Sequence, residues 1–250
     1  MLSDMELERY SRHLLVKDLG IEAQHAWHDA EVLIVGCGGL GHPLSFYIAA
    51  AGVGKITLVD PDFIELSNLQ RQFGFIAAEV GQSKAQVLAR RLRALNPLIE
   101  IHALQSRFEE LETKDVEKAN LWFDCSDNFA CRYAINNYSL RLKTALISGA
   151  ALEMDGLCTL LNQTPNSPCY ACLFPINTTL PNQRNCSESG VFAPLLGLVG
   201  SMQAQLGLSY IANKQIDSVQ SILYRWNLAR NIQSMSILKK NPHCNICSQS

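Results

Sequence analysis

The sequence lacks an excess of charge of either sign. Its 250 residues include 21 lysines and arginines and 23 aspartates and glutamates, which gives a formal net charge of −2. A protein that binds nucleic acid or an anionic membrane by electrostatics presents a surplus of basic residues on one face. We therefore expect neither nucleic acid nor a membrane to be the main partner.

The sequence also lacks a basic-then-apolar leader, an internal repeat, a low-complexity tract and a dividing linker. Its first ten residues, MLSDMELERY, do not resemble a secretory signal, so we expect a cytoplasmic location. Hydrophobic residues make up 48% of the chain, which suits a globular protein, and we expect one domain over residues 1–250. Without a leader, the nine cysteines favour free thiols, metal ligands or a reactive cysteine over disulfides.

The strongest pattern lies in residues 31–60. A short apolar run at 32–35 predicts a buried strand, and a G-x-G-x-x-G turn with one extra glycine follows it: Gly36, Gly38, Gly39 and Gly41. Glycine permits a sharp turn and the close approach of a phosphate, and the next helix directs its N-terminal N–H groups at that phosphate. A second strand at 55–59 ends at Asp60, whose carboxylate can accept hydrogen bonds from ribose hydroxyls. The unit predicts a nucleotide site and leaves open whether the nucleotide is a cofactor or a substrate.

Polar side chains follow the ends of the expected strands. Asn68, Arg71 and Gln72 lie beyond the second strand, where ligands bind in open α/β sheets. Lys84 begins an amphipathic helix, against the helix dipole, so it either contacts an anion such as phosphate or is simply solvated. Asp127, in the run DCSDN after the fourth strand, either caps the next helix or helps to hold a hard cation such as magnesium.

Strands and helices alternate over the first 148 residues, which predicts an α/β fold with a doubly wound, mostly parallel, Rossmann-like sheet. We expect strands at 32–35, 55–59, 99–104, 121–123 and 144–148. We expect helices at 3–16, 24–29, 83–95, 129–142 and 194–212. The last helix is long and apolar but is interrupted by glutamines and small residues, so it predicts a buried or subunit-interface helix rather than a membrane span. After Gly149, short β-prone pieces and paired cysteines indicate a C-terminal β portion that carries zinc.

Two C-x-x-C pairs, CYAC and CNIC, supply the four thiolates of a tetrahedral structural zinc site: Cys169, Cys172, Cys244 and Cys247. If they share one zinc, two distant segments must meet; the alternative is two unrelated thiol pairs. Between them, a long polar segment holds Cys186 close to Arg184. A nearby cation favours the thiolate of Cys186, although an incidental surface cysteine is the alternative.

Further motifs are spread over the whole chain: RYSRHLL, VLIVGCGGLG, AGVGKITLVD, LSNLQRQ, GQSKA, DCSDN, SGAALEMDG, CYAC, RNCSESG, APLLGLVGS and CNIC. Together they resemble the ThiF/MoeB family of bacterial adenylyltransferases, which are related to ubiquitin-activating enzymes. The combination of LSNLQRQ, the glycine turn and the paired C-x-x-C motif is specific to such proteins, and a dehydrogenase has no use for it. Enzymes of this family adenylate the C-terminal glycine of a small ubiquitin-like sulfur carrier.

The resemblance implies ATP as the substrate and magnesium and zinc as the metals. It implies that the glycine turn lines the ATP phosphates, that Asp60 holds the ribose, that Asp127 holds magnesium and that the four cysteines hold zinc. Phosphate contacts fall to Asn68, Arg71 and Lys84. By its own pattern Arg12 lies on a solvated helix face, but it looks like the family arginine that reaches into the neighbouring protomer's site, which implies a homodimer.

The resemblance also divides between two branches of the family. The segments RNC, around Cys186, and NPLIEIHALQSRF look like the thiamin-branch enzyme, whereas SGAALEMDG looks like the molybdopterin-branch enzyme. We expect a ThiS-like carrier in thiamin thiazole synthesis, with a MoaD-like carrier in molybdopterin synthesis as the alternative. In the first branch Cys186 joins the catalytic set of Arg12, Arg71, Lys84 and Asp127 through a covalent link to the carrier. Sulfur would come from a separate donor such as a cysteine desulfurase. An NAD-dependent oxidoreductase and a non-catalytic carrier-binding scaffold are the rival interpretations.

Overall fold

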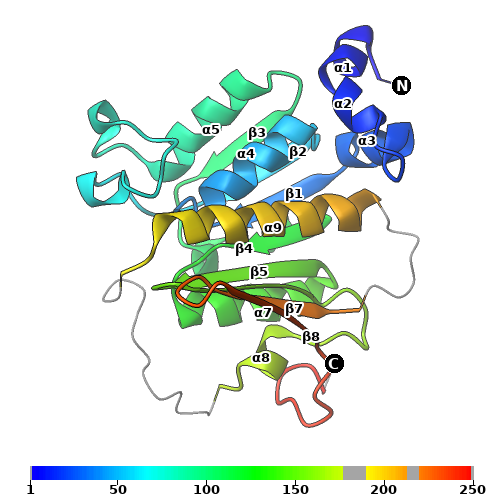
Figure 1. Ribbon diagram of the computed structural model, residues 1–250, viewed down its shortest axis with the longest axis vertical. Coiled ribbons are helices and arrows are strands. Elements are labelled where there is room, and N and C mark those ends of the chain that lie inside the picture. The colour runs from blue at the N-terminus through cyan, green and yellow to red at the C-terminus, as the bar shows by residue number, and fades with distance from the viewer. Residues whose placement is uncertain (1, 177–189, 213–219, 249–250) are drawn as a thin grey trace.

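One mixed sheet organises the computed structural model, which describes residues 2–176, 190–212 and 220–248 (Figure 1). The strands follow the spatial order β3-β2-β1-β4-β5-β6-β7-β8. The first five are parallel and the last three are antiparallel. Their bounds are β1 Glu31–Val35, β2 Lys55–Val59, β3 Glu100–Leu104, β4 Leu121–Asp124, β5 Ala145–Leu152, β6 Asp155–Leu161, β7 Ile222–Asn227 and β8 Ile232–Ile237. The order reverses between β1 and β4, so the doubly wound, mostly parallel prediction is confirmed.

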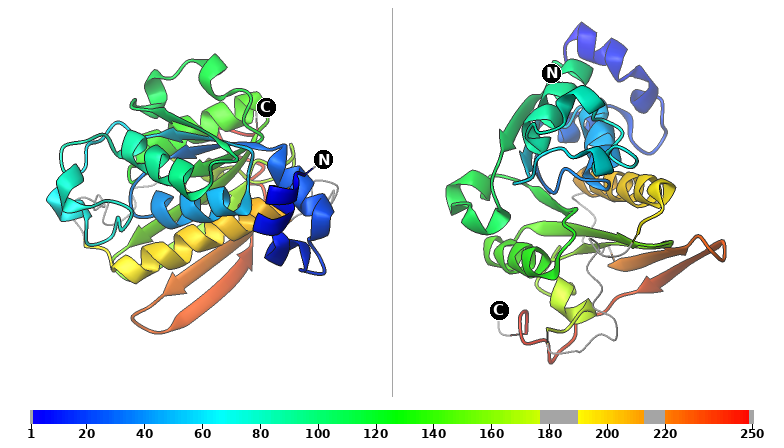
Figure 2. Two further views of the ribbon diagram at one scale, coloured as in Figure 1. Left: turned by 90° about the horizontal axis from the view of Figure 1, so that it is seen from above. Right: turned by 90° about the vertical axis from the view of Figure 1, so that its left-hand side faces the viewer.

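Helices cover both faces of this sheet. Their bounds are α1 Asp4–Arg9, α2 Ser11–Leu14, α3 Gly20–His28, α4 Gly41–Ala51, α5 Lys84–Leu95, α6 Thr113–Val116, α7 Phe129–Leu142, α8 Tyr170–Leu173 and α9 Ala193–Ala212. Short 3-10 turns lie at η1 Leu66–Asn68, η2 Ala77–Glu79 and η3 Phe108–Glu110. The helices α3, α4, α5 and α9 pack on one face, and α7 and α8 on the other (Figure 2).

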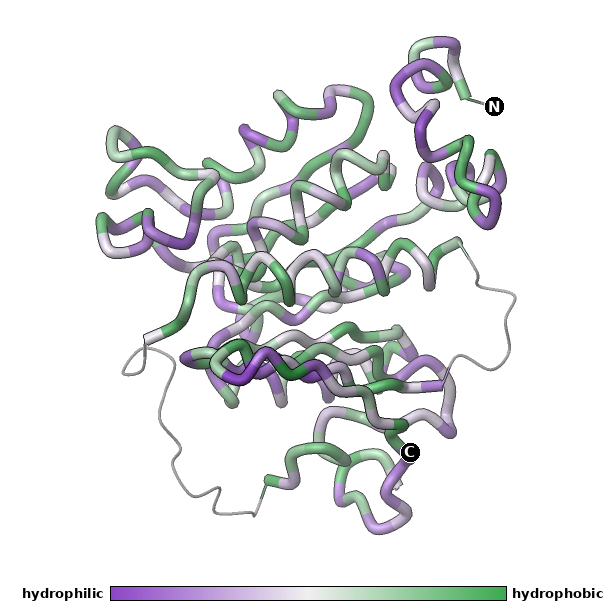
Figure 3. The backbone as a smooth tube through the Cα atoms, in the orientation of Figure 1, coloured by the Kyte–Doolittle hydropathy of each residue, from purple (hydrophilic) through white to green (hydrophobic). Residues whose placement is uncertain are grey.

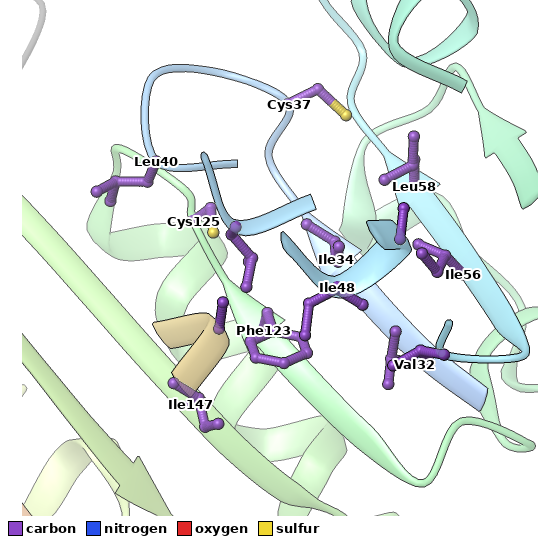
Figure 4. Packing of buried hydrophobic residues seen from close by; sticks show 14 of the residues in the cluster. Val32, Ile34, Cys37, Leu40, Ile48, Ile56, Leu58, Phe123, Cys125 and Ile147 are labelled. Carbon is purple, nitrogen blue, oxygen red and sulfur yellow. The ribbon is translucent and has the colours of Figure 1, made fainter. Parts of the chain in front are cut away.

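Strand β1 shows how the sequence divides its side chains between the two faces. Successive residues of a strand point in opposite directions, so Val32 and Ile34 enter the larger core beside α4, while Leu33 and Val35 enter the smaller core beside α7. Because both faces are covered, the strand is apolar from Val32 to Val35 rather than alternating. Figure 4 shows Val32 and Ile34 within the larger core.

The N-terminal helix predicted over 3–16 is two helices in the structure. Ser3 caps α1 in a capping box with Glu6, as predicted. The helix then breaks at Tyr10, whose backbone leaves helical geometry while its buried side chain contacts the α4 terminus at Gly52 and its hydroxyl accepts a hydrogen bond from Asn96 Nδ2 at 2.9 Å. Anchoring this ring to the core sets the direction of the chain, and α2 restarts immediately afterwards.

Helix α9 is, in the part of the chain that is described, the one helix long and apolar enough to cross a membrane by length and composition. It packs instead along α4 and the strands β5 and β6, and hydrophobic residues extend along most of its length (Figure 3). Two glycines permit this close approach, because a Cβ at Gly200 would meet Leu40 O at 2.6 Å and a Cβ at Gly207 would meet the ring of Phe123 at 2.3 Å. Its packing supports the buried position, which is one of the two positions that the sequence predicted.

Candidate active site

A cavity of about 770 Å³ lies at the carboxyl ends of β1, β2 and β4. This is the edge of an open α/β sheet at which ligands bind, next to the point where strand order reverses. Most of the residues predicted to bind a nucleotide line it: Gly36, Gly38, Gly39, Asp60, Asn68, Arg71, Lys84 and Asp127. The fold thus brings together, from five separate segments, side chains that the sequence places up to 91 positions apart, counting from Gly36 to Asp127.

The glycines of the turn have different structural roles. Gly36 has φ +99°, and a Cβ there would lie 2.6 Å from Cys125 O, so the residue must be glycine for both conformation and space. At Gly41 a Cβ would lie 2.0 Å from Gly36 O. That residue belongs to the packing of the turn and is not among those lining the cavity. Around Gly38, by contrast, a Cβ would meet only Gln72 Nε2, at 3.6 Å. This glycine therefore leaves the backbone open to the cavity.

Asp60 ties the second strand to the glycine turn. Its Oδ2 accepts a hydrogen bond from Cys37 N at 2.6 Å, and its Oδ1 accepts one from Asp62 N at 2.8 Å. Burial raises the pKa of Asp60, while these N–H donors and the charge of Lys84 act in the opposite direction. The carboxylate therefore lies against the glycine turn, and Asp60 lines the cavity.

Lys84 has an anionic partner that the sequence did not reveal. Its Nζ lies 2.9 Å from Asp62 Oδ2, and its side chain is 9% exposed against 63% for Asp62. The conflict between this lysine and the dipole of α5 is thus offset in this structure by the carboxylate of Asp62. Because Asp62 is largely solvated, the pair is weak, and Lys84 remains available to a stronger anion in the cavity.

Asn68 and Arg71 enter from the loop after β2. Asn68 is buried, and its Oδ1 accepts a hydrogen bond from Glu65 N at 3.1 Å within the 3-10 turn η1. Arg71 Nη1 donates to Ser67 O at 3.1 Å. Gln72 lies beneath them, buried against the glycine turn. The short turns of this loop hold all three side chains at the cavity.

The structure of the loop DCSDN shows that Asp127 is not the cap of α7, and its role in cation binding stays a prediction. Asn128 is the residue that caps α7, since its Oδ1 accepts a hydrogen bond from Cys131 N at 2.9 Å. Asp127 is exposed and lines the cavity. An acidic oxygen in that position suits a hard cation bound together with phosphates, so the residues present fit magnesium.

A buried network holds this loop. Asp124 is one of the two carboxylates of DCSDN that the sequence indicated for a hard cation, but the structure buries it among hydrogen-bond donors. Asp124 is fully buried and accepts hydrogen bonds from Ser126 Oγ at 2.6 Å and from Ser148 Oγ at 2.7 Å. From α9, Gln203 Nε2 donates to Asp124 O at 3.0 Å. From α7, Arg132 Nη1 lies 3.7 Å from Asp124 Oδ2. For Gln203 and Arg132, the sequence signals were a glutamine in an apolar helix and an arginine beside apolar residues.

Arg12, like Gly41, is a predicted site residue that does not line this cavity. Arg12 is exposed on α2, among N-terminal helices that lie at the amino end of β1, across the molecule from the 61–82 loop (Figure 1). It does not line the cavity of its own chain, which is compatible with a role in a neighbouring copy. Cys186 lies outside the described residues, so its role stays a prediction.

The two C-x-x-C pairs meet, as the shared-site prediction requires. Their four sulfur atoms all lie within 4.8 Å of one another, with Cys169 Sγ 3.7 Å from Cys244 Sγ and Cys172 Sγ 3.5 Å from Cys247 Sγ. Zn–S bonds of about 2.3 Å in a tetrahedron separate sulfurs by about 3.8 Å. The four residues could therefore hold a zinc ion with little movement, in a closed set that leaves no ligand position open.

Fold and cavity together define a Rossmann-like α/β protein with a nucleotide-type glycine turn and a separate four-cysteine cluster. The model of the ThiF family matches residues 10–246, and the chain belongs to this family. The prediction made from its motifs is thereby confirmed.

Among curated relatives, the molybdopterin-synthase adenylyltransferase of Salmonella typhimurium (strain LT2) is 37% identical over 249 residues and covers 99% of both chains. The sulfur carrier protein ThiS adenylyltransferase of Escherichia coli (strain K12) is 36% identical over 251 residues, which is 100% of this chain and 98% of that protein. The adenylyltransferase and sulfurtransferase MOCS3 of Dictyostelium discoideum is 34% identical, and this chain spans 58% of its length. The solved structure of E. coli MccB with ATP has a TM-score of 0.80, at 24% identity, over 98% of this chain and 75% of that one, which supports the fold.

Proposed function

We propose that this protein is an ATP-dependent adenylyltransferase that activates the C-terminal glycine of a ubiquitin-like sulfur carrier. The observation that carries the proposal is the convergence of Asn68, Arg71, Lys84 and Asp127 beside the glycine turn in one cavity. Nucleotide binding alone does not call for two cations and an exposed carboxylate at the same edge, whereas transfer of a nucleotidyl group does. The activities named for the two bacterial relatives support the same reaction.

The proposed chemistry follows from charge. The carboxylate of the carrier attacks the α-phosphate of ATP, an acyl adenylate forms, and the bond to pyrophosphate breaks. Because both reactants are anions, Arg71 and Lys84 would neutralise phosphate oxygens, and a magnesium ion held by Asp127 would supply further positive charge. No general base is required, since a carboxylate is already ionised at neutral pH. Lys84 would exchange its exposed partner Asp62 for the phosphates.

The test is ATP–pyrophosphate exchange with a purified ThiS protein that ends in Gly-Gly. We expect exchange in the native protein and a fall of roughly 10²- to 10³-fold in Asp127→Ala, the cost of removing one charge-stabilising group. Glu117→Ala is the matched control, because Glu117 is an exposed acid away from the cavity. Undiminished exchange in Asp127→Ala would contradict the assignment. NADH binding that ATP cannot displace would favour an oxidoreductase.

We propose that the active unit is a homodimer in which Arg12 completes the partner's site. Large exposed hydrophobic side chains support an interface both near Arg12 and on the loop after β2: Leu15, Val16, Ile21, Phe63, Leu66 and Phe73. Mixing Arg12→Ala with Asp127→Ala should restore part of the activity, because one site of the mixed dimer is then intact. Failure to complement, despite demonstrated subunit exchange, would place Arg12 in its own subunit's site.

For the carrier we propose a ThiS-like protein, with sulfur from a separate donor such as a cysteine desulfurase. The support is the RNC motif at Cys186, while SGAALEMDG and the Salmonella relative keep a MoaD-like carrier as the second candidate. Cys186→Ser should leave pyrophosphate exchange nearly intact, because it removes no charge-stabilising group, and should abolish a thiol-labile adduct with the carrier in mass spectra. Full thiocarboxylate formation by this variant, with no adduct in the native protein, would favour the molybdopterin branch.

Strand β8 offers the carrier a docking edge. It ends the sheet, all six of its residues are exposed, and it projects from the body with β7 (Figure 2). Ile232, Met235 and Ile237 are 51–66% exposed. This edge has no further strand among the described residues, and an edge with apolar side chains can accept a strand from the sheet of a ubiquitin-like partner. Met235→Asp should raise the carrier KM in exchange without changing ATP affinity, and an unchanged carrier KM would exclude this edge.

A further inference from the structure

Arg132 is a buried cation at the side of the cavity, in the first turns of α7. Its side chain is 7% exposed, and its guanidinium donates a hydrogen bond to the carbonyl of Ser126, the residue before Asp127. The same group lies 3.7 Å from the carboxylate of Asp124, which is 1% exposed. One side chain thus contacts the loop DCSDN at two points on either side of Cys125.

The loop is also held at its beginning. The backbone N–H of Ser126 donates to Asp124 Oδ1 at 3.0 Å, and Ser148 Oγ on β5 donates to Asp124 Oδ2. These contacts fix the end of β4, and through it the start of the loop. On the two sides of Asp127, the Arg132 bond holds the Ser126 carbonyl and the Cys131 N–H holds the Asn128 side chain.

A buried ion pair is a costly way to obtain stability, because taking both charges out of water offsets most of their attraction. Its geometry, however, is well defined: a guanidinium is planar and can serve two acceptors in fixed directions, which an ammonium group cannot do equally well. The arrangement therefore suits the fixing of a loop better than it suits stabilisation.

Arg132 also connects this loop to the cysteine cluster. Its guanidinium interacts with the hydroxyl of Tyr170, which follows the zinc-ligand candidate Cys169 in the chain. Tyr170 N in turn donates to Asn136 Oδ1 at 2.8 Å, one helical turn along α7 from Arg132. The cluster and the cavity are therefore braced by the same stretch of α7.

We propose that Arg132 is a positioning residue that fixes the carboxylate of Asp127 for cation binding during adenylation. The inference rests on the proposed adenylyltransferase function and adds a residue to its machinery. It assigns to Arg132 no contact with the reacting atoms: the guanidinium acts through the Ser126 carbonyl and the backbone that follows it.

The test compares Arg132→Lys with Arg141→Lys in the full-length protein. Both arginines belong to α7, but Arg141 is exposed, lies over the ring of Tyr138 at 4.1 Å and hydrogen-bonds Thr113. Exchange with ThiS is measured against magnesium concentration at saturating ATP, together with zinc content and the thermal midpoint. Since Lys keeps the charge but lacks the planar fork that serves both Ser126 O and Asp124, we expect the magnesium concentration for half-maximal exchange to rise roughly tenfold. Arg141→Lys should match the native protein.

A merely structural role would lower the thermal midpoint and the amount of active protein, and it would leave the half-saturating magnesium concentration unchanged. Unchanged magnesium dependence in a folded, zinc-bearing Arg132→Lys therefore overturns the proposal. If that variant fails to fold, Ser148→Ala is the second test, because it removes a hydrogen bond to Asp124 from outside the cavity. We expect the half-saturating magnesium concentration to rise by a smaller factor than in Arg132→Lys, and an unchanged value refutes the inference. Failure of the native protein to exchange would instead refute the proposed function on which it depends.

Discussion

Protonation of His42 should make the folded protein unusually sensitive to mild acid. The residue lies in the first turn of α4 and is completely buried. Its Nδ1 is 2.9 Å from Gly38 O in the glycine turn. Its ring packs edge-on against Phe75 at 4.4 Å and Phe73 at 5.7 Å, and its Nε2 has no hydrogen-bond partner within the described residues. A proton on Nε2 would have to be accommodated among aromatic rings.

The size of the effect follows from the pKa. Burial lowers the pKa of His42 from 6.5 to about 4, against the smaller raising effect of its backbone contacts. As pH falls through 6.5, the unfolded chain binds a proton that the folded protein refuses, so stability present above pH 6.5 is lost progressively down to the folded pKa. With these two values, the loss at about pH 5 is about 2 kcal/mol, a considerable part of the stability of an ordinary domain.

The assay is urea unfolding of the native protein and of His42→Asn between about pH 8 and pH 5. The Asn side chain carries an amide N–H that can serve Gly38 O, but it does not titrate. The difference in unfolding free energy between the two proteins should change by about 2 kcal/mol across this range, with the native protein losing more. Because all other titrating groups are common to both, parallel pH profiles would refute the argument.

Three further perturbations test other parts of the structure. Burial acts to raise the pKa of Glu79, but the Ile76 N–H and two arginines outweigh it and hold the pKa below its usual value. Glu79→Gln should therefore cost about 1 kcal/mol of unfolding free energy at neutral pH, and progressively less as pH falls through that lowered pKa. A difference in unfolding free energy that stays constant with pH would contradict this. Cys244→Ser should lose the one zinc per chain that elemental analysis of the native protein should find, together with part of its thermal stability, and a retained stoichiometric metal would exclude the shared site. Gln203→Leu should leave the buried Asp124 carbonyl without its donor and cost about 1–3 kcal/mol, so an unchanged thermal midpoint would show that this bond contributes nothing.

The sequence was informative wherever the structure depends on local pattern. The predicted helix 129–142 has the observed bounds of α7, and the second strand has those of β2. Apolar runs, turn residues and caps act within a few positions, so they can be recognised without knowledge of the fold. For the same reason, the glycine turn and the paired cysteines indicated a nucleotide site and a metal site before any spatial arrangement was known.

The C-terminal hairpin shows where such reasoning stopped. Strands β7 and β8 were not predicted as elements. Every residue of β8 is exposed, so neither face must be apolar and the sequence carries no alternation to recognise. Likewise β5 continues to Leu152, beyond its predicted end at 148, because pairing with β6 extends it across the C-terminal part of the sheet. These features depend on neighbours that are distant in the chain.

The polar supports of the cavity were beyond local pattern for a related reason. Asp62 meets Lys84 across 22 positions and Gln203 meets Asp124 across 79, so each partner separately has the appearance of a loop acid or a lone amide. The capping question at Asp127 could be settled only by the hydrogen bond that Asn128 makes. What the structure adds is therefore the pairing, and pairing decides which charges are already satisfied and which remain available to a ligand.

The two ends of the cavity also differ in whether their charged groups already have partners. At the glycine turn, Asp60 is engaged by two backbone N–H groups, so its position is set before any nucleotide arrives. At the opposite wall, Asp127 is exposed, and its position depends on a loop held by buried side chains from α7 and β5. If the protein has the proposed function, its site must bind a sugar firmly and admit a cation together with phosphates, and this difference serves both requirements. Changes at the glycine turn should therefore weaken nucleotide affinity, whereas changes behind Asp127 should appear as altered magnesium dependence at nearly constant affinity for ATP.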